Sequence, residues 1–439
     1  MTLRSDTAAA LYAEVAAAQS ASRLPSLCAG VLQDGKLAWT GSRGRFVTRD
    51  GVREGAREGA LPDSDTQYRI GSISKTLTAV LVLQCRDDGL LSLNDAVGKY
   101  LPGIAFGHLT IRNLLAHSGG MHAEPAGPWW ERNPGVSFEA LAAAMESTAA
   151  AGEAGQRHHY SNLGYALLGE IVARLRGSSW AELVQQRILD PLEMRRTSYL
   201  ATGRAASGFS VHPWSGRLDD EPAYDAGAMA PAGQLWSTIE DLGRYAAFWI
   251  DPASEVLAPD TVEEMAAPHA SDPAEALNAG YGLGLRLHTA ESHLLVGHTG
   301  SMPGFLAGLF VDRARRLGGI TLANATTGGA PMLAIDLLRT LATYEPPVAA
   351  EWLPEPELSQ GSELLGPWYW GNTPYLLTVV DGTLLLRGLN GGRQSRFVPE
   401  GSDLYRGLDG SFAGEYLRVI APDHLDLATY TFTRTPYGR

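Results

Sequence analysis

The stretch that decides the fold is Tyr68-Arg69-Ile70-Gly71-Ser72-Ile73-Ser74-Lys75, and an apolar run over 77–83 follows it. The apolar run predicts a buried helix. If that helix begins at Ser72, the side chain of Lys75 lies one turn further along on the same face. The free N–H groups and the positive dipole end of a helix start favour negative charge at Ser72. Ser72 and Lys75 therefore have the arrangement of an activated nucleophile and its base.

Lysine is rare in this chain, and its rarity makes Lys75 informative. The other lysines are Lys36, in a predicted hairpin, and Lys99, on a predicted surface; every remaining Lys or Arg position is Arg. Arginine stays protonated, whereas a desolvated lysine can lose its proton and act as a base. The segment alone leaves an alternative open, a serine at a helix start followed by a lysine whose amine reaches solvent.

The bulk composition limits the partners. The 439 residues carry a formal net charge of −13, with 45% hydrophobic and 19% charged residues. Nucleic acids and anionic membrane surfaces require a basic patch, so we expect neither as a partner, and no apolar run approaches the length of a membrane span. Cys28 and Cys85 are too few for a disulfide framework. Residues 5–19 indicate an amphipathic helix and not a secretory signal, so we expect a cytoplasmic protein.

The periodicity of apolar residues predicts strands on both sides of a mainly helical stretch. Asp34-Gly35 joins two strand-like runs and predicts a β-hairpin. Further strands and a helix are expected later in the chain, at 293–296, 305–311, 320–323 and 332–344. Ser237 and Glu240 have the spacing of a helix capping box. We expect an α+β fold, an antiparallel sheet flanked by helices with an inserted helical lobe over about 76–235.

A Pro-rich segment divides the chain into two predicted domains. Residues 1–345 contain the sheet and the helical lobe, and residues 346–358 have the composition of a linker. Residues 359–439 consist of short alternating segments separated by turn residues. They predict a small all-β domain, with a closed barrel as its expected form.

Two further elements carry chemistry. In Tyr160-Ser161-Asn162, a tyrosine beside a lysine can act as a base or relay a proton, and Asn162 can donate its amide to a carbonyl. His298-Thr299-Gly300-Ser301 ends a predicted strand, where Gly300 lets a ligand approach the backbone and the strand edge can pair with an extended substrate. Taken alone, the first element fits a helix cap and the second fits a strand followed by a turn.

The three elements occur in one order, and together they identify a resemblance. The chain resembles the serine β-lactamase and penicillin-binding protein superfamily, in the branch of class C β-lactamases, D-aminopeptidases, D-Ala-D-Ala carboxypeptidases and family VIII carboxylesterases. Ser72-x-x-Lys75 is similar to the S-x-x-K motif, Tyr160-x-Asn162 to Y-x-N, and His298-Thr299-Gly300 to K-T-G in its histidine form. The resemblance covers about residues 8–345, and the β tail is similar to the lipocalin-like domain of some members.

The resemblance implies acyl transfer through a covalent acyl-enzyme on a β-lactamase/transpeptidase-like fold. Ser72 attacks a carbonyl, while Lys75 and Tyr160 share the general-base and proton-relay work; which of the two takes the proton first is left open. The backbone N–H groups of Ser72 and Ser301 form the oxyanion hole. Asn162 orients the acyl side of the substrate.

The departure from the family pattern is His298, where β-lactamases usually have Lys. A fixed positive charge there helps to hold the carboxylate of a penicillin or of a peptide terminus, whereas a histidine is mostly neutral at pH 7. We expect His298 to hydrogen-bond Tyr160 or the substrate instead, as a fourth catalytic residue. The weaker clamp shifts the expectation toward esters, amides or acyl-thioesters that lack this carboxylate.

Trp129 and Trp130 follow a segment that, by family analogy, leads into a loop near the site. They are candidates for an apolar wall against an acyl group, with ordinary loop packing as the alternative. His117, His158 and His159 lack the spacing of metal ligands with a nearby carboxylate or thiolate. We therefore expect neither a metal nor a cofactor.

The resulting hypothesis is a cytoplasmic serine hydrolase whose partner is a small ester, amide or D-residue peptide substrate. One alternative is a penicillin-binding-type thioesterase or acyltransferase that releases or cyclises peptides from a carrier protein. Another is a non-catalytic ligand-binding module that has kept the fold. The oligomeric state is left open by the sequence.

Overall fold

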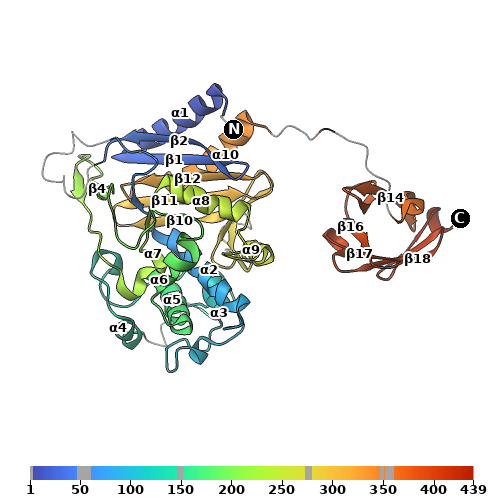
Figure 1. The fold of residues 1–439 in the computed structure, drawn as a ribbon, viewed down its shortest axis with the longest axis horizontal. Helices are drawn as coiled ribbons and strands as arrows, with labels where there is room; N and C mark the ends of the chain where they lie inside the picture. The colour runs from blue at the N-terminus through green and yellow to red at the C-terminus, as the bar shows by residue number, and fades with distance from the viewer. Residues whose placement is uncertain are drawn as a thin grey trace. The chain divides into compact units, whose positions relative to one another are not determined.

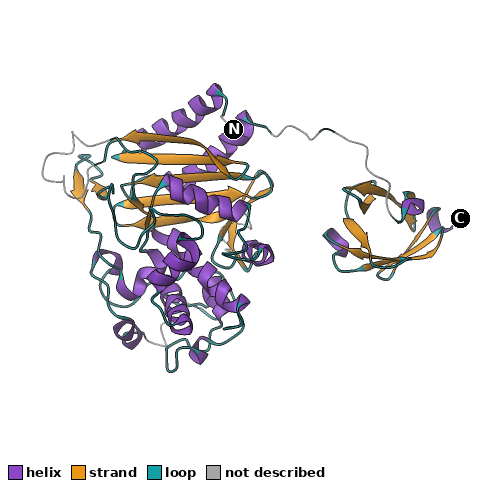
Figure 2. Ribbon diagram, in the orientation of Figure 1, coloured by secondary structure: helices purple, strands orange, loops and turns teal. Residues whose placement is uncertain are grey.

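The computed structural model describes residues 3–46, 61–145, 152–271, 279–346, 351 and 360–438. The chain forms two compact units, Met1–Pro347 and Val348–Arg439. Figures 1 and 2 show a sheet with helices on its faces and a helical lobe next to it in the first unit, and a barrel of strands in the second. The predicted α+β class and the all-β domain at the C-terminal end are confirmed.

The central sheet is antiparallel throughout, with the strand order β2-β1-β12-β11-β10-β9-β8-β7. Asp34 and Gly35 form the turn of the predicted hairpin, both with positive φ, as the favoured two-residue turn requires. The strands are β1 (Ser26–Gln33), β2 (Lys36–Gly44), β7 (Ala270–Ser271), β8 (Ala279–Tyr281), β9 (Arg286–Ala290), β10 (His293–Met302), β11 (Phe305–Asp312) and β12 (Leu317–Ala323).

Helices cover both faces of this sheet and also form the lobe. Three helices pack on the sheet: α1 (Ser5–Ala21) and α10 (Ala330–Tyr344) on one face, α8 (Ile239–Ile250) on the other. The lobe contains α2 (Ser74–Asp87), α3 (Ile111–Leu115), α4 (Phe138–Ala143), α5 (Asn162–Arg176), α6 (Trp180–Val184) and α7 (Ala230–Gly233), and α9 (Pro259–Ala266) precedes β7. Among the described helices, none has both the length and the apolar character of a membrane-spanning segment.

β1 shows why the sheet needs two helical layers. Leu27 and Val31 belong to the apolar cluster that includes α1 and α10. Cys28 and Leu32 belong to the cluster that includes α8. Since successive side chains of a strand point to opposite faces, a strand covered on both sides is apolar throughout.

The start of α2 differs from the prediction. Its first residue is Ser74, and Ser72 lies in a 3-10 turn, Gly71–Ile73, that leads into it. The prediction of a helix beginning at Ser72 was therefore wrong by two residues. The continuous backbone turn still places Ser72 and Lys75 side by side.

The predicted cap of α8 is also displaced. The N-cap is Thr238, whose hydroxyl accepts a hydrogen bond from the N–H of Asp241, so the predicted pair of Ser237 and Glu240 is wrong. Ser237 is paired with Tyr68 through the two short strands β3 (Tyr68–Arg69) and β6 (Trp236–Ser237). This pairing keeps Ser237 extended, so the helix begins one residue later. A second short pair joins β4 (Phe209–Val211) to β5 (Leu218–Asp220).

The second unit is a closed barrel of strands β13 to β20. Its core contains Trp368, Phe397, Leu417 and Phe432, which alternate along the strands with more exposed side chains. The predicted linker over 346–358 lies outside the described residues, except Pro346 and Glu351. The strands are β13 (Gly366–Trp370), β14 (Thr373–Val380), β15 (Thr383–Gly388), β16 (Gln394–Pro399), β17 (Leu404–Gly407), β18 (Tyr416–Ala421), β19 (His424–Leu427) and β20 (Tyr430–Thr433).

Candidate active site

The turn that carries Ser72 is pressed against strand β10. Gly71 has a φ of +51°, and a Cβ at that position would lie 2.6 Å from the backbone nitrogen of Ser301. A Cβ on Gly300 would lie 1.9 Å from the carbonyl oxygen of Ile70. Only glycine fits at both places, because the two backbones meet without room for a side chain. This close approach sets Ser72 beside the His298–Ser301 segment.

Lys75 is fully buried in the first turn of α2. Its Nζ donates hydrogen bonds to Ser72 Oγ, 2.9 Å away, and to the carbonyl oxygen of Ala232, 2.6 Å away. Burial lowers the pKa of Lys75 to about 7, although the charges of Glu124 and Glu131 oppose the shift. Near neutral pH a large fraction of the amine is therefore uncharged and able to accept the proton of Ser72.

Tyr160 completes the group. Lys75 Nζ lies 5.0 Å from the centre of the Tyr160 ring. Burial raises the pKa of Tyr160, while a hydrogen bond with the Ser72 side chain and the charge of Arg286 act in the opposite direction. The phenol thus stays protonated near pH 7 and is equipped to donate. The structure brings the hydroxyl, the amine and the phenol together.

His298 lines the cleft beside Tyr160, but its ring nitrogens make other contacts than the predicted one. It is 1% exposed, and its Nε2 lies 2.7 Å from the Tyr281 hydroxyl. Its Nδ1 lies 2.5 Å from the carbonyl oxygen of Thr299. A carbonyl only accepts, so Nδ1 carries the proton and Nε2 accepts from the Tyr281 hydroxyl. Burial lowers the pKa of His298, which keeps the imidazole neutral. The ring thus forms neither of these hydrogen bonds with Tyr160, and the predicted contact with a substrate stays a prediction.

Arg286 is a site residue that sequence reasoning missed. It begins β9, opposite Gly297 of β10, and its Nη1 donates to Thr299 Oγ1 over 3.1 Å. The guanidinium of Arg286 thus brings a positive charge next to Thr299, whereas the neighbouring His298 is neutral. No motif marks Arg286, because its place depends on the β9–β10 register.

Beyond Gly297, no strand of the described residues pairs with β10 on the β9 side. The β10–β11 hairpin pairs Met302 with Phe305 and Ser301 with Leu306. Backbone hydrogen bonds alternate along an antiparallel pair, so Ser301 turns its N–H away from β11 and toward this free edge. That direction suits the predicted oxyanion hole.

Asn162 is the first residue of α5, and its Nδ2 donates to Glu124 Oε1 over 2.7 Å. Glu124 Oε2 accepts from the indole Nε1 of Trp130, also over 2.7 Å. Trp129 is 58% exposed and donates its indole N–H to Glu131. The two tryptophans thus hold carboxylates in place, a role that their sequence position did not indicate.

A cleft of about 600 Å³ opens beside Ser72, Tyr160 and the His298–Ser301 segment. Trp129, Trp130 and Asn162 are not among the residues that line it, so the proposed apolar wall is not part of this cavity. Within the described residues, no group of His, Cys, Asp or Glu is arranged to hold a metal. The lining residues are Ser72, Ala123, His158, His159, Tyr160, Arg286, His298, Thr299, Gly300, Ser301, Leu306 and Pro331.

The model of the beta-lactamase family matches residues 11–343. The chain belongs to the beta-lactamase family. Members of this family are serine β-lactamase-like and penicillin-binding protein-like hydrolases. The family resemblance that was based on the three motifs is therefore confirmed. A domain of unknown function (DUF7586) matches residues 358–434, and the likeness of the barrel to lipocalins stays a prediction.

Individual relatives of this beta-lactamase family member are distant. Beta-lactamase-like protein 2 of Dictyostelium discoideum is 28% identical over 317 residues, which cover 67% of this chain and 55% of that protein. The chain spans between 55% and 62% of the length of three curated relatives that it matches.

Solved structures share the fold. The octameric penicillin-binding protein homologue from Pyrococcus abyssi superposes with a TM-score of 0.69 over 97% of this chain and 99% of that one, at 23% identity. At this identity the likeness shows the fold alone. A D-stereospecific amidohydrolase from Streptomyces sp. gives a TM-score of 0.63 at 25% identity, over 78% of this chain and 99% of the other.

Proposed function

We propose that this chain is a serine hydrolase that forms an acyl-enzyme on Ser72 and cleaves small esters or amide bonds, including those of D-amino acids. The observation that carries the proposal is the burial of Lys75, whose Nζ lies 2.9 Å from Ser72 Oγ and forms no ion pair with a carboxylate among the described residues. Burial lowers the pKa of this amine to about 7, which matches the pH at which a general base is most useful.

In the proposed first step, Lys75 takes the proton of Ser72 as Oγ bonds to the substrate carbonyl carbon. The pKa directions favour Lys75 over Tyr160 as this first base. The backbone N–H groups of Ser72 and Ser301 stabilise the oxyanion. Tyr160 then gives its proton to the leaving group as the carbonyl–leaving group bond breaks, and Lys75 returns a proton to Tyr160. Water repeats the sequence on the acyl-enzyme and releases the acid.

The substrate proposal includes a leaving group that carries a carboxylate. Arg286 donates to Thr299 Oγ1 at the free edge of β10, so a positive charge lies next to the leaving side. The charge of Arg286 therefore weakens the expectation, drawn from the neutral His298, that the substrate lacks a carboxylate here. The likeness to a D-stereospecific amidohydrolase supports the choice of amides and D-residues.

A covalent probe tests the proposal. A fluorophosphonate should add one adduct to the wild-type protein by intact-mass spectrometry, and peptide mapping should place it on Ser72. Ser72→Ala should not react, whereas Ser74→Ala, a matched control two residues away, should. Turnover of p-nitrophenyl acetate should follow the same pattern. A wild-type protein that neither labels nor turns over this ester is not the proposed hydrolase.

The same assay separates hydrolysis from acyl transfer. With D-alanine amide added as an amine acceptor, a hydrolase releases mainly the free acid. A transfer product that dominates at millimolar acceptor would favour the thioesterase or acyltransferase alternative, with its carrier-protein partner.

A further inference from the structure

The backbone on both sides of Tyr160 is bonded to one residue, His117, which follows helix α3. The N–H of His159 donates to the carbonyl oxygen of His117 over 2.7 Å. The N–H of Ser161 donates to the imidazole Nδ1 of His117 over 3.0 Å. The residues immediately before and after Tyr160 are thus both held by His117, and these bonds fix the backbone from which the phenol projects.

The ring of His117 also contacts the phenol itself. The centroids of the two rings lie 4.2 Å apart, and the ring planes are tilted by 36°. The ring of Tyr281 lies edge-to-face against His117, at 4.5 Å between centroids. Because His117 is only 2% exposed, these neighbours confine its ring.

The hydrogen bond with Ser161 determines which imidazole nitrogen carries the proton. A backbone N–H only donates, so Nδ1 accepts and the ring proton is on Nε2. Burial lowers the pKa of His117, which keeps the ring neutral and Nδ1 free of a proton. Nε2 has no hydrogen-bond partner among the described residues. Within that part of the chain, the ring therefore makes one hydrogen bond, and it is the bond that holds the Tyr160 segment.

The backbone of His117 is in the left-handed region. Its φ is +53°, at the second position after the last residue of α3. Glycine or asparagine usually occupies such a position at a helix end, because a larger side chain is crowded there. A histidine is therefore unfavourable for the backbone, and its contacts with residues 159–161 supply a reason for its presence.

We propose that His117 is a positioning residue of the hydrolase: by accepting the N–H of Ser161, its Nδ1 holds the phenol of Tyr160 where the phenol gives its proton to the leaving group. His117 does not line the cleft, so it acts through Tyr160, which does. A small displacement of a proton donor is costly, because proton transfer requires hydrogen-bond distance. The inference rests on the proposed role of Tyr160 and adds the residue that supports it.

Two leaving groups separate this role from a general structural one. p-Nitrophenyl butyrate releases a stable nitrophenolate that needs no proton. The ethoxy oxygen of ethyl butyrate takes the proton of Tyr160 as its bond to the carbonyl carbon breaks. The quantity compared is kcat/KM, because it includes no step after the leaving group departs. A general loss of folded protein lowers both values and leaves the ratio of ethyl to p-nitrophenyl ester unchanged.

Two variants of His117 divide its contacts. His117→Phe keeps a ring against Tyr160 but has no acceptor for Ser161. It should lower kcat/KM for ethyl butyrate at least about tenfold, and that for p-nitrophenyl butyrate by less than about threefold. His117→Asn restores an acceptor through its amide oxygen and tolerates a positive φ. Because it keeps the hydrogen bond, both values should stay within about threefold of the wild-type protein.

Ser118→Ala is the matched control, since Ser118 is the next residue and its hydroxyl accepts from Asn113 and not from the Tyr160 segment. It should leave the ratio unchanged. An unchanged ratio in His117→Phe overturns the proposal, and so does a ratio in His117→Asn that is as low as in His117→Phe.

A measurement on the wild-type protein does not depend on the folding of a variant. NMR with isotope-labelled histidine should show the ring of His117 protonated on Nε2 at pH 7, with Nδ1 as the acceptor. A ring that is protonated on Nδ1 cannot accept from Ser161 and overturns the proposal.

Fluorophosphonate labelling is run on the same samples. Wild-type protein that labels on Ser72 and hydrolyses only the p-nitrophenyl ester overturns this inference alone, since no proton then reaches the leaving group. Wild-type protein that neither labels nor turns over either ester overturns the proposed function and, with it, the role of His117.

Discussion

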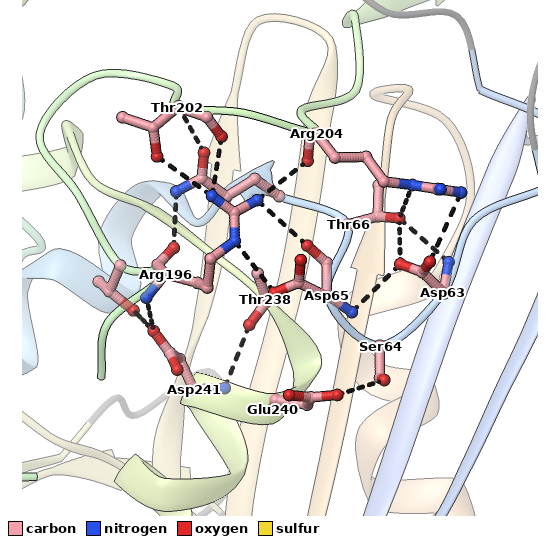
Figure 3. Close-up of polar contacts among 12 residues, drawn as sticks. Asp63, Ser64, Asp65, Thr66, Arg196, Thr202, Arg204, Thr238, Glu240 and Asp241 are labelled. Atoms are coloured by element: carbon pink, nitrogen blue, oxygen red, sulfur yellow. Dashed lines mark hydrogen bonds and ion pairs between the residues drawn. The ribbon is translucent and has the colours of Figure 1, made fainter. Parts of the chain in front are cut away.

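Two polar regions of the first unit differ in burial and in how their charged groups are paired: one is partly exposed and rich in ion pairs, and the other surrounds the buried Lys75. In the network of Figure 3, the guanidinium of Arg196 pairs with Asp65 over 3.0 Å, and that of Arg204 with Asp63 over 3.5 Å. Asp241 accepts from the backbone N–H of Arg196 and from Arg244. In the candidate site, the hydrogen bonds that Lys75 forms with the described residues go to a hydroxyl and a carbonyl.

The difference separates a structural network from a reactive one. Each cation of the first region named above is held by a carboxylate, and the contacts tie residues 61–67 to the 196–204 segment and to the start of α8. Lys75 forms no ion pair with a described carboxylate, and its burial lowers its pKa. Pairing preserves the charge of a side chain, whereas burial without pairing makes its proton easy to lose.

The largest effect is expected from Lys75→Met. Loss of the base should lower kcat/KM for a p-nitrophenyl ester by about a thousandfold. Lys99→Met is the control, since Lys99 is exposed and paired with Asp95, and it should leave the rate within twofold. Comparable rates in the two variants would mean that Lys75 is not the base.

Asp241→Ala should act on stability. Asp241 is 1% exposed and accepts from Arg196, Thr197 and Arg244. Its removal should cost about 3 kcal/mol in the free energy of unfolding, measured in urea, because buried donors lose their partner. Glu240→Gln, in an exposed contact with Ser64 Oγ, should change it by less than about 0.5 kcal/mol. A comparably small change for Asp241→Ala would show that the network around Asp241 does not stabilise the fold.

The stability of the wild-type protein should depend on the protonation of Lys75. Its pKa is about 7 when folded against an ordinary value of 10.5, so between these values the unfolded chain binds a proton that the folded chain does not. Stability should therefore rise with pH in this window, by about 1.4 kcal/mol per unit relative to Lys75→Met, and the difference should be constant below pH 7. Parallel curves for the two proteins would contradict a lowered pKa.

The rate should follow the same titration. If neutral Lys75 is the base, kcat/KM for a neutral ester should increase about tenfold per pH unit below pH 7 and level off above it. His298 and His117 are not expected to contribute, since burial lowers the pKa of both. A midpoint near 10 would assign the proton to another group.

The smallest effect concerns Arg286, a cation without a carboxylate partner among the described residues. Arg286→Gln should reduce kcat/KM for a peptide that ends in a carboxylate by about three- to tenfold relative to its amide, as for an exposed ion pair. Arg217→Gln, on the exposed β4–β5 hairpin, is the control. An unchanged ratio would exclude Arg286 from substrate binding.

Much of the fold could be predicted from the sequence, because the patterns that indicate its turns, strands and helices are local. The Asp34-Gly35 turn, the strand alternation and the apolar run after Lys75 each depend on neighbouring residues. The capping box shows the limit of such signals. Thr238 with Asp241 has the same spacing as Ser237 with Glu240, and the pairing of Ser237 with Tyr68 decides between them.

By itself, the sequence determined the identity and order of Ser72, Lys75, Tyr160 and the β10 motif, and with them the family. Only the tertiary structure decided the contacts of Arg286, of Glu124 and of the His298 ring. Strand register, the meeting of separate loops and the burial of a ring are set by contacts between residues far apart in the chain. No local spacing encodes such contacts, and they determine the charge that a substrate meets.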